Sequence, residues 1–599
     1  MFDYVSADHL RFLLHEYLRA PERIADFEAY DGYDAEAFDM ALQAAIDISD
    51  QYLFPIYRVM DKEKATCENG VVWTHPKLQE GIDAMAEGGW ISAAAPFEVG
   101  GQGMPMVLNN AGSLVFMAAN ANLAAYAFLT TGASNLILAY GSQELKDTYL
   151  PHMYSGRFQG TMALTEPQAG SSLSDITSVA KLQDDGTYKI TGQKIYISGG
   201  DHAGVDNVVH LMLARIEGAA AGTRGISLFV VPKKRPDGDG CWVPNDVLTA
   251  GIYGKMGQKG YVAAHLMYGE NDGTVGYLVG EPHQGLKYMF SMMNEARIGT
   301  GIMATGSASG AYYASLKYAK ERPQGRHPSQ KDVSKPQVPI IEHADVRRML
   351  LQQKSIVEGS MALLLEASLW ADLSEKGGDT PEAKEAHLLL ELLTPVIKTF
   401  PSEYGTIAVT QGMQVLGGAG YCDDFPLEQY YRDIRVNAIY EGTTGIHGMD
   451  LLGRKVLMEN GAGLKALSER MESDIAACAK TFPDEAAAVA KAAGQLGATT
   501  GHLIGILKAD GPEAFLADAS LYLEQFGLVV IAWHWLRMAA TAQTKLDGGD
   551  GRLSDTFYQS AVTTMRYFVE YELPKAGALN RRLNSTRRVT LEAEPALLV

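Results

Sequence analysis

The stretch Thr187–Ser198, TYKITGQKIYIS, decides the fold class of this chain. Its β-branched and aromatic residues are of the kinds enriched in strands. Three similar runs follow it, NVVHLMLARI at 207–216, GISLFVVPK at 225–233 and AAHLMY at 263–268, with Gly, Asp and Asn turns between them. Short runs separated by turn residues are typical of an antiparallel sheet. We therefore predict a β domain, a barrel or sandwich, over residues 161–281.

Helical periodicity flanks this domain on both sides. Apolar residues recur at spacings of three and four in MALQAAIDISDQYLFPIYRVM at 40–60, and the same periodicity returns from Gly285. The polar, Pro-bearing stretch Arg322–Pro339 interrupts it and is interpreted as a loop or hairpin. After Gly461–Gly463 the chain is rich in Ala and again helical in pattern. The expected fold class is therefore α+β multidomain: an N-terminal extension (1–34), a helical N-terminal domain (35–160), the β middle domain (161–281), a helical-bundle C-terminal domain (282–458) and an appended helical domain (459–599).

Composition and charge exclude several classes of protein. With 51 Lys plus Arg against 71 Asp plus Glu, the net charge of −20 opposes nucleic-acid binding, which depends on dense cationic surface. The four cysteines, Cys67, Cys241, Cys422 and Cys478, lie far apart without a CxxC pair. Neither a disulfide framework nor a metal site is expected, and reduced thiols favour a cytoplasmic protein.

The chain carries no predicted membrane anchor. Its N-terminus, with Asp3, Asp8 and Glu16, lacks the uninterrupted apolar region of a signal peptide. The longest apolar stretch, Phe526–Trp533, falls short of the ~20 residues that span a bilayer. We expect a soluble protein without a transmembrane segment.

Few motifs carry chemistry on their own. Gly299-Thr-Gly301-Ile-Met-Ala304 approximates a dinucleotide fingerprint, but it lies in a helical pattern, where small residues are more often used for helix packing. LTEPQAGSS at 164–172 and KIYISGG at 194–200 could present hydroxyls and backbone to a flat ligand, or could simply be turns. Glu441, among Gly and apolar neighbours, could be a base in a desolvated pocket or a solvated surface carboxylate.

Taken together, the ordered segments resemble one enzyme family. LTEPQAGSS, GQKIYISGG, KMGQKGYVAAHLMY, LVGEPHQGLKYMF, MNEARIG, QVLGGAGY, YRD and IYEGTTGIH resemble motifs of the acyl-CoA dehydrogenases, which have the domain order predicted above. The extra residues at both ends resemble the long-form branch of that family. That resemblance implies a short-chain substrate such as 3-(methylthio)propanoyl-CoA, an intermediate of dimethylsulfoniopropionate demethylation, or butanoyl-CoA. Alternatives are a medium- or long-chain dehydrogenase, an acyl-CoA oxidase on the same fold, or a non-enzymatic assembly protein.

The resemblance also implies roles for single residues. Glu441 matches the base that removes the α-proton, while hydride passes to FAD and a trans-2-enoyl-CoA forms. The implied substrate contacts are Ser171, Arg297 and Gly442, although Arg297 could instead form a helix-surface ion pair with Glu295. The implied FAD contacts are Leu164, Thr165, Tyr196, Ser198, Arg322, Gln414, Gly417, Gly418 and Thr443.

Some positions depart from the family pattern. Tyr196 stands where many members carry Trp, and Gly445 where Gln is common. Arg432-Asp433 is interpreted as a structural ion pair. Because Arg322 and the 414–418 segment resemble residues that reach the FAD of a neighbouring subunit, a homodimer is implied. An electron-transfer flavoprotein is the implied electron acceptor.

Overall fold

The computed structural model describes residues 4–598, without the side chains of residues 291–294; residues 1–3 of the predicted N-terminal extension lie outside it. The chain divides into two compact units. One is continuous and contains residues 40–299. The other contains residues 1–39 together with residues 300–599.

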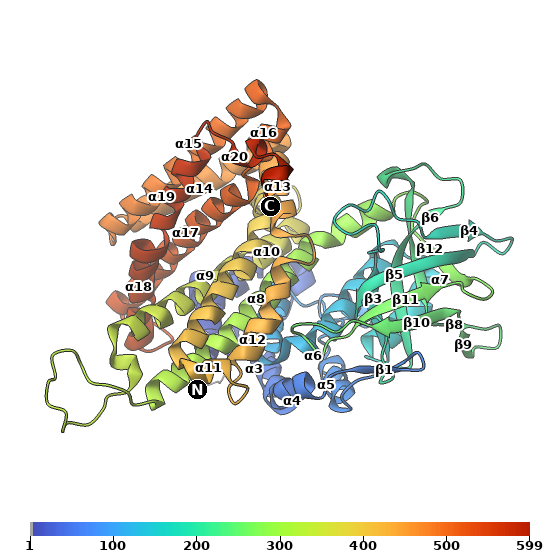
Figure 1. The fold of residues 1–599 in the computed structure, drawn as a ribbon, viewed down its shortest axis with the longest axis horizontal. Helices are drawn as coiled ribbons and strands as arrows, with labels where there is room; N and C mark the ends of the chain where they lie inside the picture. The colour runs from blue at the N-terminus through green and yellow to red at the C-terminus, as the bar shows by residue number, and fades with distance from the viewer. Residues whose placement is uncertain (1–3, 599) are drawn as a thin grey trace. The chain divides into compact units, whose positions relative to one another are not determined.

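The continuous unit contains the β domain (Figure 1). Its main sheet has the strand order β10-β11-β5-β12-β7-β6-β3, and β4 pairs with both β5 and β6, so the pairing closes into a ring. The predicted, largely antiparallel barrel is thus confirmed, except that β6 pairs in parallel with β3 and β4. The strands are β3 (Phe158–Ala163), β4 (Val179–Leu182), β5 (Tyr188–Ser198), β6 (Asn207–Ile216), β7 (Ile226–Pro232), β10 (Val247–Ile252), β11 (Ala263–Tyr268) and β12 (Thr274–Val279). This unit also contains two separate hairpins. They are β1 (Thr66–Glu68) with β2 (Val71–Trp73), and β8 (Lys234–Pro236) with β9 (Trp242–Pro244).

Helices of the same unit cover β3. They are α6 (Met106–Tyr140) and α7 (Gln143–Tyr154), and α5 (Lys77–Glu87) packs against α6. The Gln159 amide donates to the Tyr126 carbonyl on α6 at 3.0 Å. A Cβ at Gly160 would lie 2.9 Å from the Thr130 Cα, so only glycine allows this close approach of strand and helix.

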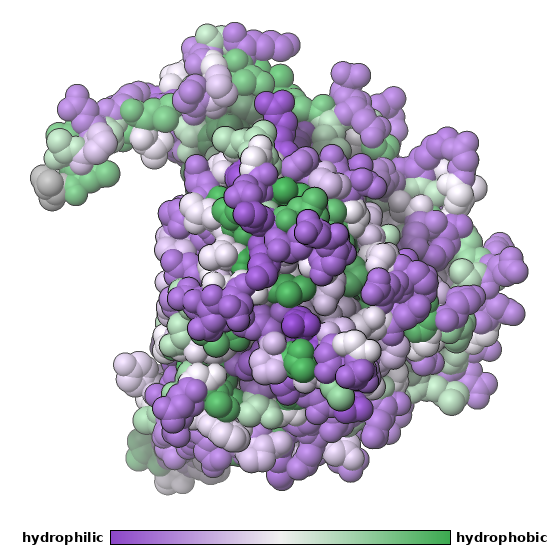
Figure 2. Space-filling model, turned by 90° about the vertical axis from the view of Figure 1, so that its right-hand side faces the viewer, coloured by the Kyte–Doolittle hydropathy of each residue, from purple (hydrophilic) through white to green (hydrophobic). Residues whose placement is uncertain are grey.

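Within the described part of the chain, α6 is the one helix long and apolar enough to cross a membrane, and 83% of its most apolar window is buried inside the protein. Burial to this extent is typical of the core helix of a soluble protein. Figure 2 shows a face with mainly hydrophilic side chains, between which apolar residues form small patches. Scattered apolar patches of this kind are normal on a protein surface.

The second unit is helical (Figure 1). Its centre is the hairpin of α9 (Ala344–Lys376) and α10 (Pro381–Leu416), packed with the part of α8 (Gly285–Glu321) that begins at Thr300. A Cβ at Gly301 would lie 2.4 Å from the Ile397 carbonyl oxygen of α10. Close helix packing therefore accounts for this glycine, as the sequence pattern predicts.

The stretch after α8 is a hairpin-like loop. Gln324 N–H donates to Val338 O at 3.0 Å, and Ile340 N–H donates to Arg322 O at 2.8 Å. Figure 1 shows the loop extending away from the helices on the left. Its Pro residues and polar composition explain why the helix ends at Glu321.

The last helices of this unit pack around α17 (Ala519–Gly548), whose stretch Phe526–Trp533 is buried. The Arg537 guanidinium meets the buried Glu366 carboxylate of α9 at 2.6 Å. Burial alone would raise the pKa of Glu366, but Arg537 and His534 lower it to about 2. The Tyr17 hydroxyl, from the N-terminal segment, bonds to His534 Nδ1 at 2.8 Å. The other helices are α14 (Ala462–Cys478), α15 (Pro483–Asp510), α16 (Pro512–Leu516), α18 (Asp555–Tyr567) and α19 (Pro574–Leu583).

Candidate active site

A buried carboxylate organises the turn that follows β3. Each oxygen of Glu166 accepts three hydrogen bonds: Oε1 from Lys194 Nζ and from the amide and hydroxyl of Ser178, and Oε2 from the amide and hydroxyl of Thr177 and from Gln168 Nε2. The distances range from 2.6 Å to 3.1 Å. This one side chain therefore ties together a turn that contains no helix or strand ladder of its own.

Lys194 joins this turn to β5. Its ammonium is fully buried and lies 2.8 Å from Glu166 and 2.9 Å from the Leu164 carbonyl. The next residue, Ile195, donates its N–H to the Thr165 carbonyl at 2.9 Å. Burial alone would raise the pKa of Glu166, but the Lys194 ammonium and the surrounding donors lower it to about 2. The predicted FAD contacts Leu164 and Thr165 are thus brought beside β5 and held there.

A β-bulge sets the direction of Tyr196. Opposite Ala264 and Leu266 of β11, β5 contains one extra residue, and Tyr196 there has φ +56°. A bulky residue in the left-handed region is strained, and such bulges are frequent next to active sites. The Tyr196 ring is 59% exposed and lies 4.3 Å from the Tyr253 ring, centroid to centroid. The bulge therefore leaves the aromatic ring of Tyr196 exposed, at a point where the side chain of a regular strand residue would pack inward.

Ser198 ends β5 and is followed by a tight turn. Gly199 has φ +59° and donates its N–H to the Val262 carbonyl at 2.8 Å. A Cβ at Gly200 would lie 2.8 Å from the Ala264 Cβ. The turn and the packing onto β11 thus account for both glycines without a ligand. Ser198, half-buried, remains beside them.

These β-domain residues suit a flat heteroaromatic ring. Thr165 and Ser198 are half-buried hydroxyls, and the exposed ring of Tyr196 offers an apolar surface on the same strand as Ser198. Hydroxyl donors beside an aromatic plane match the chemistry of the FAD isoalloxazine. Ser171, a predicted substrate contact, is exposed on the same turn as Glu166.

A wide groove lies beside Tyr253 in the same unit. Its volume is about 780 Å³, and it lies between the β1–β2 hairpin and the segment from β10 to β11. Lys64, Lys255 and Lys259 contribute to its lining. The Lys255 ammonium bonds to the Tyr261 carbonyl, so this cation holds the segment before β11.

Glu441 lies in the other unit, on a short loop before α13 (Thr444–Gly453). It is half-buried and has φ +54°, and Gly442 has φ +88°. A Cβ at Gly442 would lie 2.9 Å from His447 Nε2, so glycine is required there on both conformational and steric grounds. Two successive left-handed residues make a sharp turn immediately at the carboxylate.

Side chains of two helices, α10 and α13, fix this loop. His447 Nε2 lies 3.0 Å from the Glu441 carbonyl oxygen, and Lys398 Nζ lies 2.8 Å from the Gly442 carbonyl oxygen. The Thr443 hydroxyl accepts from the Ile446 amide as the N-cap of α13. The Thr444 hydroxyl donates to the Glu403 carboxylate. Three of the predicted site residues, Glu441, Gly442 and Thr443, thus share one preorganised loop.

Tyr440 directly precedes this loop. Burial raises the pKa of Tyr440, and the Glu441 carboxylate adds to this effect. The Tyr440 hydroxyl bonds to the Met303 sulfur at 3.2 Å. Tyr440 is therefore a neutral phenol that packs against α8, and it is no base.

The predicted contacts to a neighbouring subunit lie on the surface. Arg322 is exposed at the base of the hairpin-like loop, and Gln414, Gly417 and Gly418 are exposed at the end of α10. The Tyr318 ring, one turn before Arg322, packs edge-on against Phe425 at 5.3 Å. The end of α8 is thus linked to the segment that follows α10.

The positions of Arg297 and Arg432 differ from two further predictions. Arg297 is only 6% exposed, so it lies in the interior and not on the helix surface where the alternative interpretation placed it. The Glu295 carboxylate accepts from Asn135 at 3.1 Å. Arg432 pairs with Glu428, one helical turn earlier on α12 (Leu427–Ile434), at 2.7 Å, because i,i+4 residues face each other on a helix. The expected structural role for Arg432 holds with that partner.

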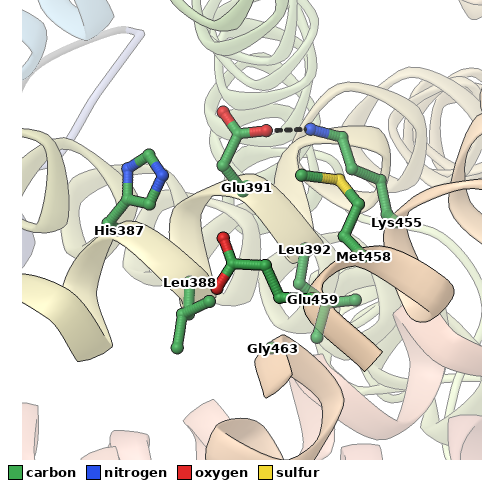
Figure 3. A pocket seen from close by; sticks show the side chains of 8 residues that line it. All are labelled: His387, Leu388, Glu391, Leu392, Lys455, Met458, Glu459 and Gly463. Atoms are coloured by element: carbon green, nitrogen blue, oxygen red, sulfur yellow. Dashed lines mark hydrogen bonds and ion pairs between the residues drawn. The ribbon is translucent and has the colours of Figure 1, made fainter. Parts of the chain in front are cut away.

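A small pocket elsewhere in this unit is no substrate site. It lies between α10, the 455–461 turn and α14, and Figure 3 shows Glu391 and Lys455 joined by an ion pair at its rim. Its volume of about 10 Å³ is roughly that of one water molecule. The ion pair anchors the segment that leads into the appended helices.

Sequence reasoning missed four residues that position the site: Glu166, Lys194, Lys398 and His447. Lys398 does carry a signal, because it lies directly between the mainly apolar run LLTPVI and Thr399-Phe400 within a helical pattern. A charge among apolar residues indicates a buried cation with a partner. Lys194 carries no such signal, because only the folded strand shows that its position is buried and paired with Glu166.

Comparison with known proteins supports one family. Models described as the N-terminal, middle and C-terminal domains of acyl-CoA dehydrogenase match residues 38–157, 161–268 and 283–457. A model described as acetyl-CoA dehydrogenase C-terminal like matches residues 467–594. The predicted long-form organisation is therefore matched along nearly the whole chain.

Individual relatives agree. The chain is 35% identical to 3-methylmercaptopropionyl-CoA dehydrogenase of Ruegeria pomeroyi, over 95% of this chain and 96% of the relative. It is 34% identical to the broad-specificity linear acyl-CoA dehydrogenase FadE5 of Mycobacterium tuberculosis, over 86% and 84%. An acyl-CoA dehydrogenase complexed with FAD from Bacillus anthracis shares the fold, with a TM-score of 0.70, 20% identity and 94% of each chain covered. The chain therefore belongs to the acyl-CoA dehydrogenase family, whose members are FAD-dependent enzymes.

Proposed function

We propose that this enzyme desaturates a short-chain acyl-CoA between its α and β carbons to give a trans-2-enoyl-CoA, with Glu441 as the base. The observation that carries the proposal is the Glu441–Thr443 loop, in which a half-buried carboxylate is held in a left-handed backbone by donors from two helices. FAD, when bound, supplies the acceptor for the β-hydride. 3-(Methylthio)propanoyl-CoA is the first candidate substrate, because the matching relative of that specificity aligns over 95% of the chain.

Glu441 has two tasks in this proposal. Its carboxylate removes the weakly acidic α-proton of the thioester. Its backbone N–H donates to the thioester oxygen, on which negative charge develops. A preorganised donor of this kind is worth about 3 kcal/mol in a water-poor site. Gly442 supports both tasks, because the absence of a side chain lets the thioester approach the backbone.

The remaining residues bind rather than react. We assign Leu164, Thr165 and Ser198 to the flavin ring, and Tyr196 to its face, in line with their exposure on β5 and the preceding turn. Ser171 and Arg297 are assigned to acyl-CoA. Arg322, Gln414, Gly417, Gly418 and Thr443 are assigned to FAD, with the first four reaching the FAD of a partner subunit.

The surface position of those four residues supports a homodimer. Arg322 and the 414–418 segment are exposed, and a guanidinium suits a phosphate group. In this proposal the dimer works in the cytoplasm and passes its electrons to an electron-transfer flavoprotein.

A broader acyl-chain range is the second candidate function. The similarity to a relative with broad specificity for linear acyl chains, 34% identical over 86% of this chain, favours it. Steady-state rates over acyl-CoAs from propanoyl to palmitoyl, with methylthiopropanoyl included, distinguish the two. A short-chain optimum supports the first candidate, whereas a flat profile supports the second.

The base assignment is tested with Glu441→Gln. Flavin reduction by acyl-CoA under anaerobic conditions is expected to fall by a factor of about 10²–10⁴, because a carboxamide cannot accept the proton. Substrate affinity and FAD content are expected to change little. Glu459→Gln is the matched control, because Glu459 also has a left-handed backbone, φ +50°, but is exposed. Reduction at the wild-type rate in Glu441→Gln would eliminate this carboxylate as the base.

A further inference from the structure

Lys398 is a buried cation with a defined target. It lies in the middle of α10 and is inaccessible to solvent. Its ammonium lies 2.8 Å from the Gly442 carbonyl oxygen. A buried ammonium is costly unless it has partners, so a lysine at this point of an apolar helix face indicates a specific use. A charge-assisted hydrogen bond to a backbone carbonyl is stronger than a neutral one.

His447 contacts the carbonyl of Glu441, the residue before Gly442. Its Nε2 lies 3.0 Å from the Glu441 carbonyl oxygen. A carbonyl oxygen only accepts, so Nε2 carries the hydrogen in this bond. His447 is buried on the first turns of α13, and the missing side chain of Gly442 makes room for its ring. Two side chains, from α10 and α13, thus hold two successive carbonyls.

The backbone that these two contacts hold has an unfavourable conformation. Glu441 and Gly442 have φ values of +54° and +88°. A glutamate rarely adopts this conformation unless surrounding contacts impose it. Rotation about the φ and ψ bonds of Glu441 would change the directions of its carboxylate and its N–H relative to the two held carbonyls. The two carbonyl contacts oppose that rotation.

We propose that Lys398 and His447 form a backbone clamp, a pair of positioning residues that hold the base and its N–H in register for proton removal. The inference rests on the proposed function, because it concerns the geometry of Glu441. It assigns neither residue a chemical step. Both act through the carbonyls of Glu441 and Gly442.

Lys398→Met tests the α10 side of the clamp. Methionine has a similar length and no donor, so the helix face stays filled while the carbonyl contact is lost. Flavin reduction is expected to slow on the order of 100-fold, the effect of a displacement of about 1 Å at a reacting group. Substrate dissociation constants are expected to stay within about threefold, since uniform binding is unchanged. Lys384→Met, at an exposed position on the same helix, is the control.

Two substitutions of His447 distinguish the effect of its N–H donor from the effect of its packing. His447→Leu fills space without a donor, whereas His447→Gln keeps an N–H donor at a similar reach. We expect flavin reduction to be up to about tenfold faster in His447→Gln than in His447→Leu, which is the effect of one neutral hydrogen bond. Equal rates in these two variants would overturn the role of the donor, even if Lys398→Met does not fold.

Hydrogen exchange of residues 439–446 provides a readout that does not depend on activity. Faster exchange is expected there in Lys398→Met and His447→Leu, and wild-type exchange in Lys384→Met. If wild-type enzyme fails to reduce its flavin with any acyl-CoA, the proposed function is wrong, while faster exchange would still support the clamp. Unchanged exchange with reduction rates within about threefold of wild type would overturn the clamp alone.

Discussion

Replacing Glu166 with Gln removes the centre of the turn that follows β3. The carboxylate accepts six hydrogen bonds, three on each oxygen. A carboxamide keeps one acceptor oxygen, and its NH₂ group would point at donors. The Lys194 ammonium would also lose its counter-charge in a site without solvent access.

The magnitude follows from two arguments. Removing one partner of a buried ion pair costs about 3–5 kcal/mol. Independently, a Glu166 pKa lowered from 4.5 to about 2 corresponds to about 3 kcal/mol of stabilisation at neutral pH. A loss of about 3 kcal/mol raises the open population of the turn on the order of 100-fold. The ordered contacts to Leu164 and Thr165 would be lost with it.

Hydrogen exchange of residues 164–178, together with the FAD content of purified protein, measures this loss. Exchange in Glu166→Gln is expected to rise by about two orders of magnitude, and FAD retention to fall. Glu270→Gln, an exposed carboxylate of the same unit, is the control. Exchange within threefold of wild type and full FAD content would refute the reasoning. The six donors would then form hydrogen bonds with other partners without a loss of stability.

Two further predictions concern pH and FAD. Burial lowers the pKa of His202 to about 4, against 6.5 when unfolded, so its share of stability is complete above pH 6.5 and is lost as the pH falls toward 4. We expect a loss of about 3 kcal/mol over that window, seen as a steep drop in the temperature of flavin release that flattens in His202→Leu; an equally steep drop in the variant would contradict it. Arg322→Gln is expected to weaken FAD retention on dialysis about tenfold or more through loss of a charge-assisted bond, whereas Lys331→Gln in the same exposed loop leaves retention unchanged. Equal retention in both variants would place the phosphates elsewhere.

The order of helical and β segments could be predicted because the apolar period changes along the chain. The runs around Thr187–Ser198 are short, rich in β-branched and aromatic residues and separated by turn residues, whereas apolar residues in the long flanking stretches recur with helical spacing. The parallel pairing of β3 with β6 could not be predicted, because it joins residues about fifty positions apart and leaves no local signal. Register between distant strands depends on packing rather than on neighbouring residues.

The chemical groups of the site were easier to predict than their supports. Glu441 and Thr165 stand in motifs with unusual local composition. Glu166 and Lys194 look like ordinary surface charges in the sequence, and only the folded barrel places them together without solvent. Lys398 stands out among apolar neighbours in the sequence, but its target carbonyl could not be predicted, because that carbonyl lies 44 residues later in the chain.

The bond between Tyr17 and His534 has a consequence for how the chain folds as it is made. The two residues lie 517 positions apart. At about 5–20 residues per second, roughly 25–100 s pass between their syntheses. The continuous stretch 40–299 carries its own partners and is complete long before then. The N-terminal segment, with its buried Leu10, Phe12 and Leu13, is therefore translated first and docks last. Until then its apolar side chains lack these partners, so this segment of the unfinished chain is open to chaperones and to aggregation.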